Sequence, residues 1–270
     1  MKNFAARFPI VFALTTTLIA MLCLVWPFLI PGISLAAQMI SGRIAICIFA
    51  IAMLTYLGWW REAGFTRPKS WRILLPYLPL LLLVILAKIS EVIKFGIRVT
   101  DLELIFLGLI VYLVGGFMEE AIFRGLVLRA LLPGGLVRAA VLSSLIFACA
   151  HLANLIANAD LNDTILQVIV AFLMGLAFTA ALAVTRNIWP AVFIHALSNF
   201  GMYMTVGGFL NTATTSQSPT LEEAIGKILL PLLLAIYSFW LLIRAQRKAR
   251  MAPSPVTFPS QPEGELRATL

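Results

Sequence analysis

Residues 102–125, LELIFLGLIVYLVGGFMEEAIFRG, decide the class of fold. The stretch is largely apolar as far as Met118 and then carries two adjacent glutamates and an arginine, Glu119, Glu120 and Arg124. A helix that crosses a bilayer needs about 20 mostly apolar residues. The segment therefore predicts a transmembrane helix with charged side chains near its end.

The rest of the chain extends this prediction. Of its 270 residues, 61% are hydrophobic and 12% are charged, and the mean hydropathy is +0.98. Soluble domains contain about 25% charged residues, so a soluble globular protein is excluded. We expect an all-α, polytopic membrane protein whose residues 1–243 form one transmembrane domain. About eight transmembrane helices are predicted, at residues 9–30, 42–60, 73–90, 102–130, 137–157, 164–185, 188–210 and 225–243.

Residues 244–270 are polar and rich in proline, and they hold too little apolar content to form a core. We therefore expect a disordered cytoplasmic tail.

The distribution of basic residues predicts the topology. The net charge is +8, but Lys and Arg lie between apolar runs rather than on one basic face, so no nucleic acid partner is indicated. When the loops are assigned alternately to the two sides, only Arg43, Lys88, Lys94, Arg98 and Lys227 fall opposite the termini. Because Lys and Arg favour the cytoplasmic side, both termini are expected there, in what we take to be a bacterial cytoplasmic membrane.

Histidine is confined to two apolar runs. The chain has only two histidines, His151 and His195. An ionisable side chain within a transmembrane helix costs about 2.5 to 3.5 kcal/mol, so each needs a partner or a role. Phe147 lies one turn before His151, where its ring can pack on the imidazole. His195 and Asn199 have i,i+4 spacing and so project from one helix face.

Helical spacing also separates the roles of the two adjacent glutamates. Glu120 and Arg124 are spaced i,i+4 and can form a buried ion pair. Glu119 lies about 100° round the helix from Glu120 and is free to point elsewhere. A water held between Glu119 and His151 could lose a proton to the carboxylate and attack a carbonyl group. His195 and Asn199 could then donate hydrogen bonds to the developing oxyanion.

Each signal also has a structural interpretation. A Glu-Glu-Arg cluster near a helix end is often an interfacial ion pair. An intramembrane histidine can pair with a carbonyl group, an asparagine can join helices, and Phe147 alone would be core filler. The joint occurrence of all these residues favours the catalytic hypothesis.

The motifs E-E-x-x-x-R, F-x-x-x-H and H-x-x-x-N, in this order on successive apolar helices, resemble those of the CPBP family of intramembrane proteases. This family includes the type II CAAX prenyl endopeptidases and the Abi proteins. The resemblance covers about residues 100–205. It implies an eight-helix fold around a membrane-open catalytic cavity and hydrolysis of a peptide bond in a membrane-anchored protein or peptide. It assigns Glu119 and His151 to water activation, His195 and Asn199 to the oxyanion site, and Glu120, Arg124 and Phe147 to supporting roles.

Other chemistries are weighed against this glutamic-type mechanism. The chain lacks the H-E-x-x-H, G-x-S-G and G-x-G-D motifs of other intramembrane proteases. Its cysteines, Cys23, Cys47 and Cys149, lie in apolar runs without C-x-x-C spacing and are expected to be buried thiols. We expect no cofactor, and zinc bound by Glu119, His151 and His195 is the alternative. A transporter and a non-catalytic immunity or scaffold protein remain as further alternatives.

Overall fold

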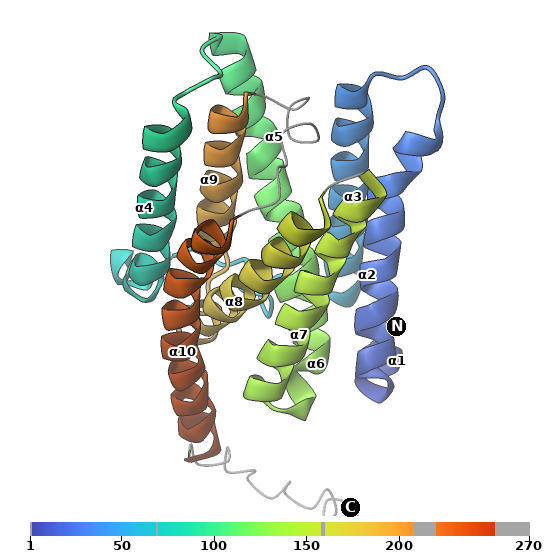
Figure 1. Ribbon diagram of the computed structural model, residues 1–270. Coiled ribbons are helices and arrows are strands. Elements are labelled where there is room, and N and C mark those ends of the chain that lie inside the picture. Colours follow the sequence, from blue (N-terminus) through green and yellow to red (C-terminus); the bar gives the residue numbers. More distant parts are fainter. Residues whose placement is uncertain (1, 69, 158–159, 208–219, 252–270) are drawn as a thin grey trace, which may run out of the picture.

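The computed structural model describes residues 2–68, 70–157, 160–207 and 220–251, and within these ranges every regular element is a helix and there is no strand. This agrees with the all-α class. The longer helices stand roughly side by side, with α8 inclined across the bundle (Figure 1). The α-helices are α1 (Lys2–Arg7), α2 (Pro9–Val25), α3 (Leu35–Leu57), α4 (Leu78–Phe95), α5 (Leu102–Glu120), α6 (Leu128–Leu131), α7 (Leu136–Ala150), α8 (Leu161–Thr185), α9 (Trp189–Val206) and α10 (Leu221–Met251).

Shorter helical turns join several of these helices. One of them, η3 (Ala121–Val127), is a π-helix that continues α5 directly. The others are 3₁₀ turns: η1 (Trp26–Leu29), η2 (Trp71–Tyr77), η4 (Leu132–Gly134) and η5 (His151–Ala157).

Six helical segments in the described ranges are long and apolar enough to cross a membrane, which makes the chain a multi-pass membrane protein. The segment that begins at Leu102 contains α5, η3, α6 and η4 in one run. The six are Pro9–Leu29, Ala37–Leu57, Leu102–Gly134, Leu136–Leu155, Leu161–Thr185 and Leu221–Met251.

The two other predicted spans, 73–90 and 188–210, correspond to α4 and α9. These helices form but are not among the six. The C-terminal half of α4 carries Lys88, Glu91 and Lys94, while His195 and Asn199 lower the apolar content of α9. Helix α9 packs against both α5 and α4 and stands between them in Figure 1. Residues 208–210 lie outside the described part.

Two expectations need correction. The tail was expected to be disordered from residue 244, but α10 continues to Met251. Arg, Gln and Lys favour helices without being apolar, so hydropathy placed the end too early. Residues 252–270 of the predicted tail lie outside the described part. The cysteines were expected to be buried, but Cys149 is exposed and Cys23 and Cys47 are half-buried.

A close helix contact sets the position of α9. A Cβ atom at Gly116 would lie 2.6 Å from the carbonyl oxygen of Val192 and 3.0 Å from the amide nitrogen of Ala196. Only a residue without a side chain permits this approach, as is common between membrane helices. The contact brings the last turn of α5 beside the residues around Ala196 on α9.

The start of α9 is fixed by Asn187, which is fully buried. Its side-chain amide donates to the carbonyl oxygen of Thr66 at 2.8 Å, and its side-chain oxygen accepts from the amide of Trp189 at 3.1 Å. Its own carbonyl oxygen accepts from the hydroxyl of Tyr77 at 2.9 Å. Three segments are thus joined where α9 begins.

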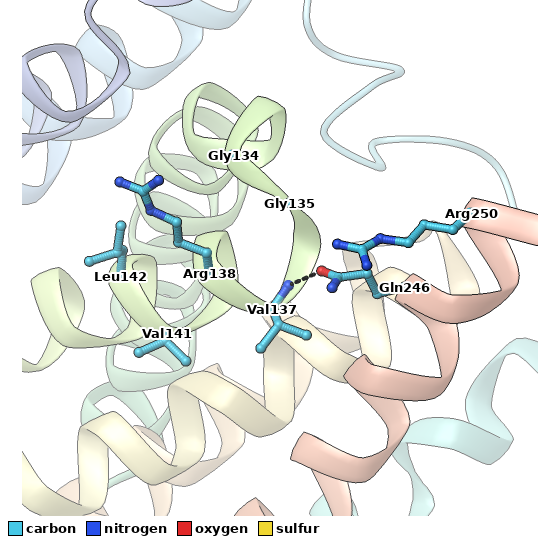
Figure 2. A pocket seen from close by; sticks show the side chains of 8 residues that line it. All are labelled: Gly134, Gly135, Val137, Arg138, Val141, Leu142, Gln246 and Arg250. Carbon is cyan, nitrogen blue, oxygen red and sulfur yellow. Dashed lines mark hydrogen bonds between the residues drawn. The ribbon is translucent and has the colours of Figure 1, made fainter.

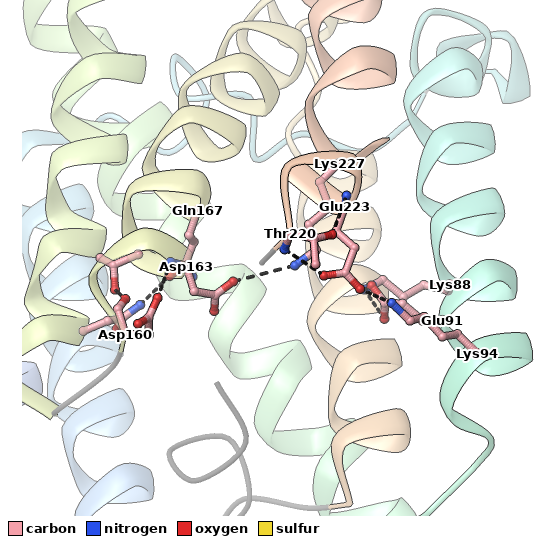
Figure 3. A network of polar contacts seen from close by, with 11 residues as sticks. Lys88, Glu91, Lys94, Asp160, Asp163, Gln167, Thr220, Glu223 and Lys227 are labelled. Atoms are coloured by element: carbon pink, nitrogen blue, oxygen red, sulfur yellow. Dashed lines mark hydrogen bonds and ion pairs between the residues drawn. The ribbon is translucent and has the colours of Figure 1, made fainter. Parts of the chain in front are cut away.

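A network of charged side chains connects α4, α8 and α10 (Figure 3). Lys94 of α4 pairs with Glu223 of α10, and Lys227 of α10 lies 3.7 Å from Asp163 of α8. These side chains are largely exposed. We refer to these two pairs as the exposed network.

Candidate functional site

Glu120, the last residue of α5, is the centre of a buried charged cluster. Its side chain is 0% exposed, and its Oε1 lies 3.1 Å from Nη1 of Arg124 and 2.9 Å from Nδ1 of His195. The i,i+4 pair that the sequence predicts therefore forms. The contact with His195 on α9 was not predicted, because it depends on how α5 and α9 pack.

Glu119 contacts the other nitrogen of the same ring. Its Oε2 lies 3.4 Å from Nε2 of His195, and its side chain is 23% exposed. His195 therefore lies between the two carboxylates of adjacent residues. If Nδ1–H donates to Glu120, the contact with Glu119 is attractive only when Nε2 or Glu119 also carries a proton.

The guanidinium group of Arg124 contacts two aromatic rings. The central carbon of its guanidinium group lies 4.5 Å from the ring centroid of Phe147 and 5.4 Å from that of Phe178. None of its side-chain nitrogens donates a hydrogen bond to a described residue, so the contact with Glu120 is an ion pair rather than an aligned hydrogen bond. The aromatic faces stabilise the cation where water has little access.

Phe147 contacts both imidazoles. Its ring is edge-on to His151, with centroids 4.9 Å apart, as the one-turn spacing predicts, and it lies 5.9 Å from the ring of His195. Nδ1 of the half-buried His151 lies 3.0 Å from the carbonyl oxygen of Phe147. When Nδ1 donates this bond, Nε2 of the neutral ring is an acceptor.

Two predicted relations are not direct contacts. Among the described residues no hydrogen bond joins Glu119 to His151, and none is made by the side chain of Asn199, which is half-buried one turn after His195. The described residues also contain no group of three His, Cys, Asp or Glu side chains close enough to hold a metal ion. Glu119, His151 and His195 therefore do not form a ready set of zinc ligands.

The sequence did not indicate Phe178. Its ring is stacked on His195, with centroids 5.5 Å apart and an interplanar angle of 16°, and it is buried. It lies in the apolar run of α8 with no charged neighbour in the sequence. No pattern in the sequence around Phe178 indicated that its ring would contact His195 or Arg124.

The π-helix η3 was also not predicted. It begins directly after Glu120 and contains Arg124. Such wide turns occur mostly as short insertions and often lie at functional sites. The hydroxyl of Ser143 on α7 donates to the carbonyl oxygen of Phe123 at 2.8 Å and so ties η3 to α7.

Comparison with known proteins adds one finding. Residues 101–201 match the sequence profile of a family described as type II CAAX prenyl endopeptidase Rce1-like. This range contains every residue of the cluster, and it agrees with the resemblance drawn from the three motifs. No curated protein matches the chain.

Proposed function

We propose that the chain is an intramembrane endopeptidase, because residues 101–201 match the Rce1-like type II CAAX prenyl endopeptidase family, which is a protease family. It hydrolyses a peptide bond of a membrane-associated protein or peptide with water that is activated by a glutamate. The observation that carries this proposal is the difference between the two adjacent glutamates around His195.

Glu119 is the carboxylate that takes a proton from water. Its side chain is 23% exposed, whereas that of Glu120 is 0% exposed and is engaged by Arg124 and His195. A general base must reach the water that it deprotonates. His151 holds the same water through Nε2, because its Nδ1 is bound to the carbonyl oxygen of Phe147.

His195 and Asn199 receive the developing oxyanion. For Nε2 of His195 to donate, the ring must carry both protons, and the neighbouring Glu119 and Glu120 suit an imidazolium. Asn199 projects from the same face of α9 and has no competing hydrogen bond to a described residue. When the amine leaves, Glu119 returns the proton that it took from the water.

We also propose that α4 and α9 cross the bilayer, giving eight crossings with both termini in the cytoplasm. Helix α9 packs against α5, which lies in a membrane-length segment, and α1 and the last turns of α10 lie at the same end of the bundle (Figure 1). A reporter that is active only outside the cytoplasm should be inactive when fused after Arg250, and activity would contradict this topology.

Zinc is the alternative chemistry. Both histidines engage Nδ1 with an oxygen atom, as zinc-ligating histidines also do. The three donor side chains are not gathered, however, and no step is routed through a metal. We expect purified active protein to contain well below one zinc per chain and to retain activity after chelation. Loss of activity on chelation, with recovery when zinc is added back, would identify Glu119, His151 and His195 as zinc ligands.

A mass comparison of membrane proteins tests the proposal. Cells of the native host that carry Glu119→Gln should accumulate at least one membrane protein in a longer form than wild-type cells do. Glu103→Gln is the matched control, because Glu103 is an exposed glutamate in the first turn of α5. Identical masses in both strains, with normal accumulation of the Glu119→Gln protein, would contradict the proposal.

A further inference from the structure

Two pockets flank the C-terminal end of α10, away from the catalytic cluster. One, of about 440 Å³, lies between the last turns of α10 and the turn that begins α7 (Figure 2). The other, of about 520 Å³, lies on a different face of the same helix end and is lined by Trp240, Ile243, Arg244, Arg247, Lys248 and Met251. Both combine basic and apolar side chains.

The first pocket lies where membrane-length helices end. The segments Leu102–Gly134 and Leu136–Leu155 meet at Gly135, and the segment that contains α10 ends at Met251. Gly134, Gly135 and Arg250 all line the pocket. It is therefore at the boundary of the apolar layer, which is the depth of lipid headgroups.

The lining separates into an apolar wall and a basic rim. Val137, Val141 and Leu142 line it from α7, and Arg138 and Arg250 supply two guanidinium groups. None of the described residues that line it is acidic, and neither arginine forms an ion pair within the described chain. Both positive charges are thus available to an anion.

A contact between helices shapes the pocket. The side-chain oxygen of Gln246 accepts the amide of Val137 at 2.9 Å, which holds the last turns of α10 against the first turn of α7 (Figure 2). Helix α7 has no side-chain cap at Gly135, so the positive end of its dipole adds to the charge of the arginines.

We propose that this pocket binds the phosphate of an anionic glycerophospholipid. Arg138 and Arg250 contact the phosphate, since guanidinium groups match its geometry. An acyl chain lies along Val137 and Val141. The apolar wall and the boundary position favour a lipid over free phosphate, and basic pockets between helices at this depth suit anionic headgroups.

Lipid binding to the purified full-length protein tests this site. Native mass spectrometry would compare phosphatidylglycerol with phosphatidylcholine of the same acyl chains. Arg138→Gln combined with Arg250→Gln should weaken phosphatidylglycerol binding about tenfold or more. Phosphatidylcholine binding should change much less, because the choline cation already offsets the charge of its phosphate. The control is Arg7→Gln with Arg61→Gln, which removes the same charge elsewhere and should behave as wild type.

Three outcomes would overturn the site. Unchanged phosphatidylglycerol binding in the Arg138→Gln, Arg250→Gln protein would exclude it, and equal weakening in the control would assign binding to the general surface charge. Displacement of the lipid by millimolar inorganic phosphate would make free phosphate the ligand. If the double variant does not accumulate, Arg250→Gln alone decides, with binding about fivefold weaker expected.

Discussion

The charged cluster at the end of α5 and the exposed network between α4, α8 and α10 contain similar ion pairs in opposite surroundings. The side chains of Glu120 and Arg124 are 0% and 1% exposed, whereas those of Lys94 and Glu223 are 39% exposed or more. Solvent screens an exposed pair, so its partners can be lost separately at little cost. A buried charge that loses its partner has no such compensation.

The two regions also differ in whether their charges can take part in the proposed reaction. Among the described residues, only the buried cluster places carboxylates against an imidazole, and only there does one arginine contact two aromatic rings. Substitutions in the charged cluster should therefore abolish cleavage or lower the stability of the protein. Substitutions in the exposed network should have almost no effect on either.

The largest effect is expected for the groups that handle protons. Glu119→Gln, His151→Ala and His195→Ala should each lower the cleavage rate at least about 10³-fold, because each removes a proton acceptor or an oxyanion donor. The cleavage rate of a substrate found by the mass comparison measures this, and the protein should accumulate normally. A folded but inactive Glu120→Ala protein beside an active Glu119→Ala protein would show that the two carboxylates have exchanged roles.

Substitutions in the buried ion pair of Glu120 and Arg124 should change the stability of the protein. Arg124→Met removes the arginine that pairs with the buried Glu120 and leaves this carboxylate only His195 as a described partner, which should lower the free energy of unfolding by about 3 to 5 kcal/mol. Adding Glu120→Gln removes the carboxylate charge and should restore part of that loss. Unfolding of the purified protein measures both. Equal stability of the wild-type and Arg124→Met proteins would show that the pair is not needed for folding.

Asn199→Ala should have an intermediate effect. Loss of one oxyanion donor lowers the rate about 10²- to 10³-fold, while His195 still donates. The melting temperature should be unchanged, because the side chain of Asn199 has no hydrogen bond to a described residue. A wild-type rate would remove Asn199 from the oxyanion site.

The smallest effect is expected in the exposed network. Lys94→Ala should shift the melting temperature by less than about 2 °C, since the pair with Glu223 is exposed. The cleavage rate should stay within about twofold of wild type. A large loss of activity without a loss of stability would mean that α4 and α10 act on the site.

Sequence spacing predicted contacts within one helix and failed for contacts between helices. The pair Glu120–Arg124 and the packing of Phe147 on His151 follow from a spacing of four residues, and both occur. The contact of Glu120 with His195 depends on the close approach at Gly116, which no local pattern encodes.

Prediction of the fold from the sequence was limited in the same way. Hydropathy located the apolar runs, including 102–130 and 164–185, because burial in a membrane requires them. It could not place the end of α10, whose last turns are helical but basic. It also could not show that η3 is a π-helix, since hydropathy measures apolar content and not the width of a helical turn.

The wide turn η3 also sets how the residues before it and the residues after it are oriented around the axis of their transmembrane segment. An α-helix advances about 100° per residue, and a π turn accommodates additional chain at nearly the same height. Upstream of it, Glu119 and Glu120 face His195 on α9. Downstream of it, Arg129 faces outward and pairs with Glu62 at 2.8 Å. Removing one residue within 121–127 would therefore rotate the faces on either side of η3 against each other.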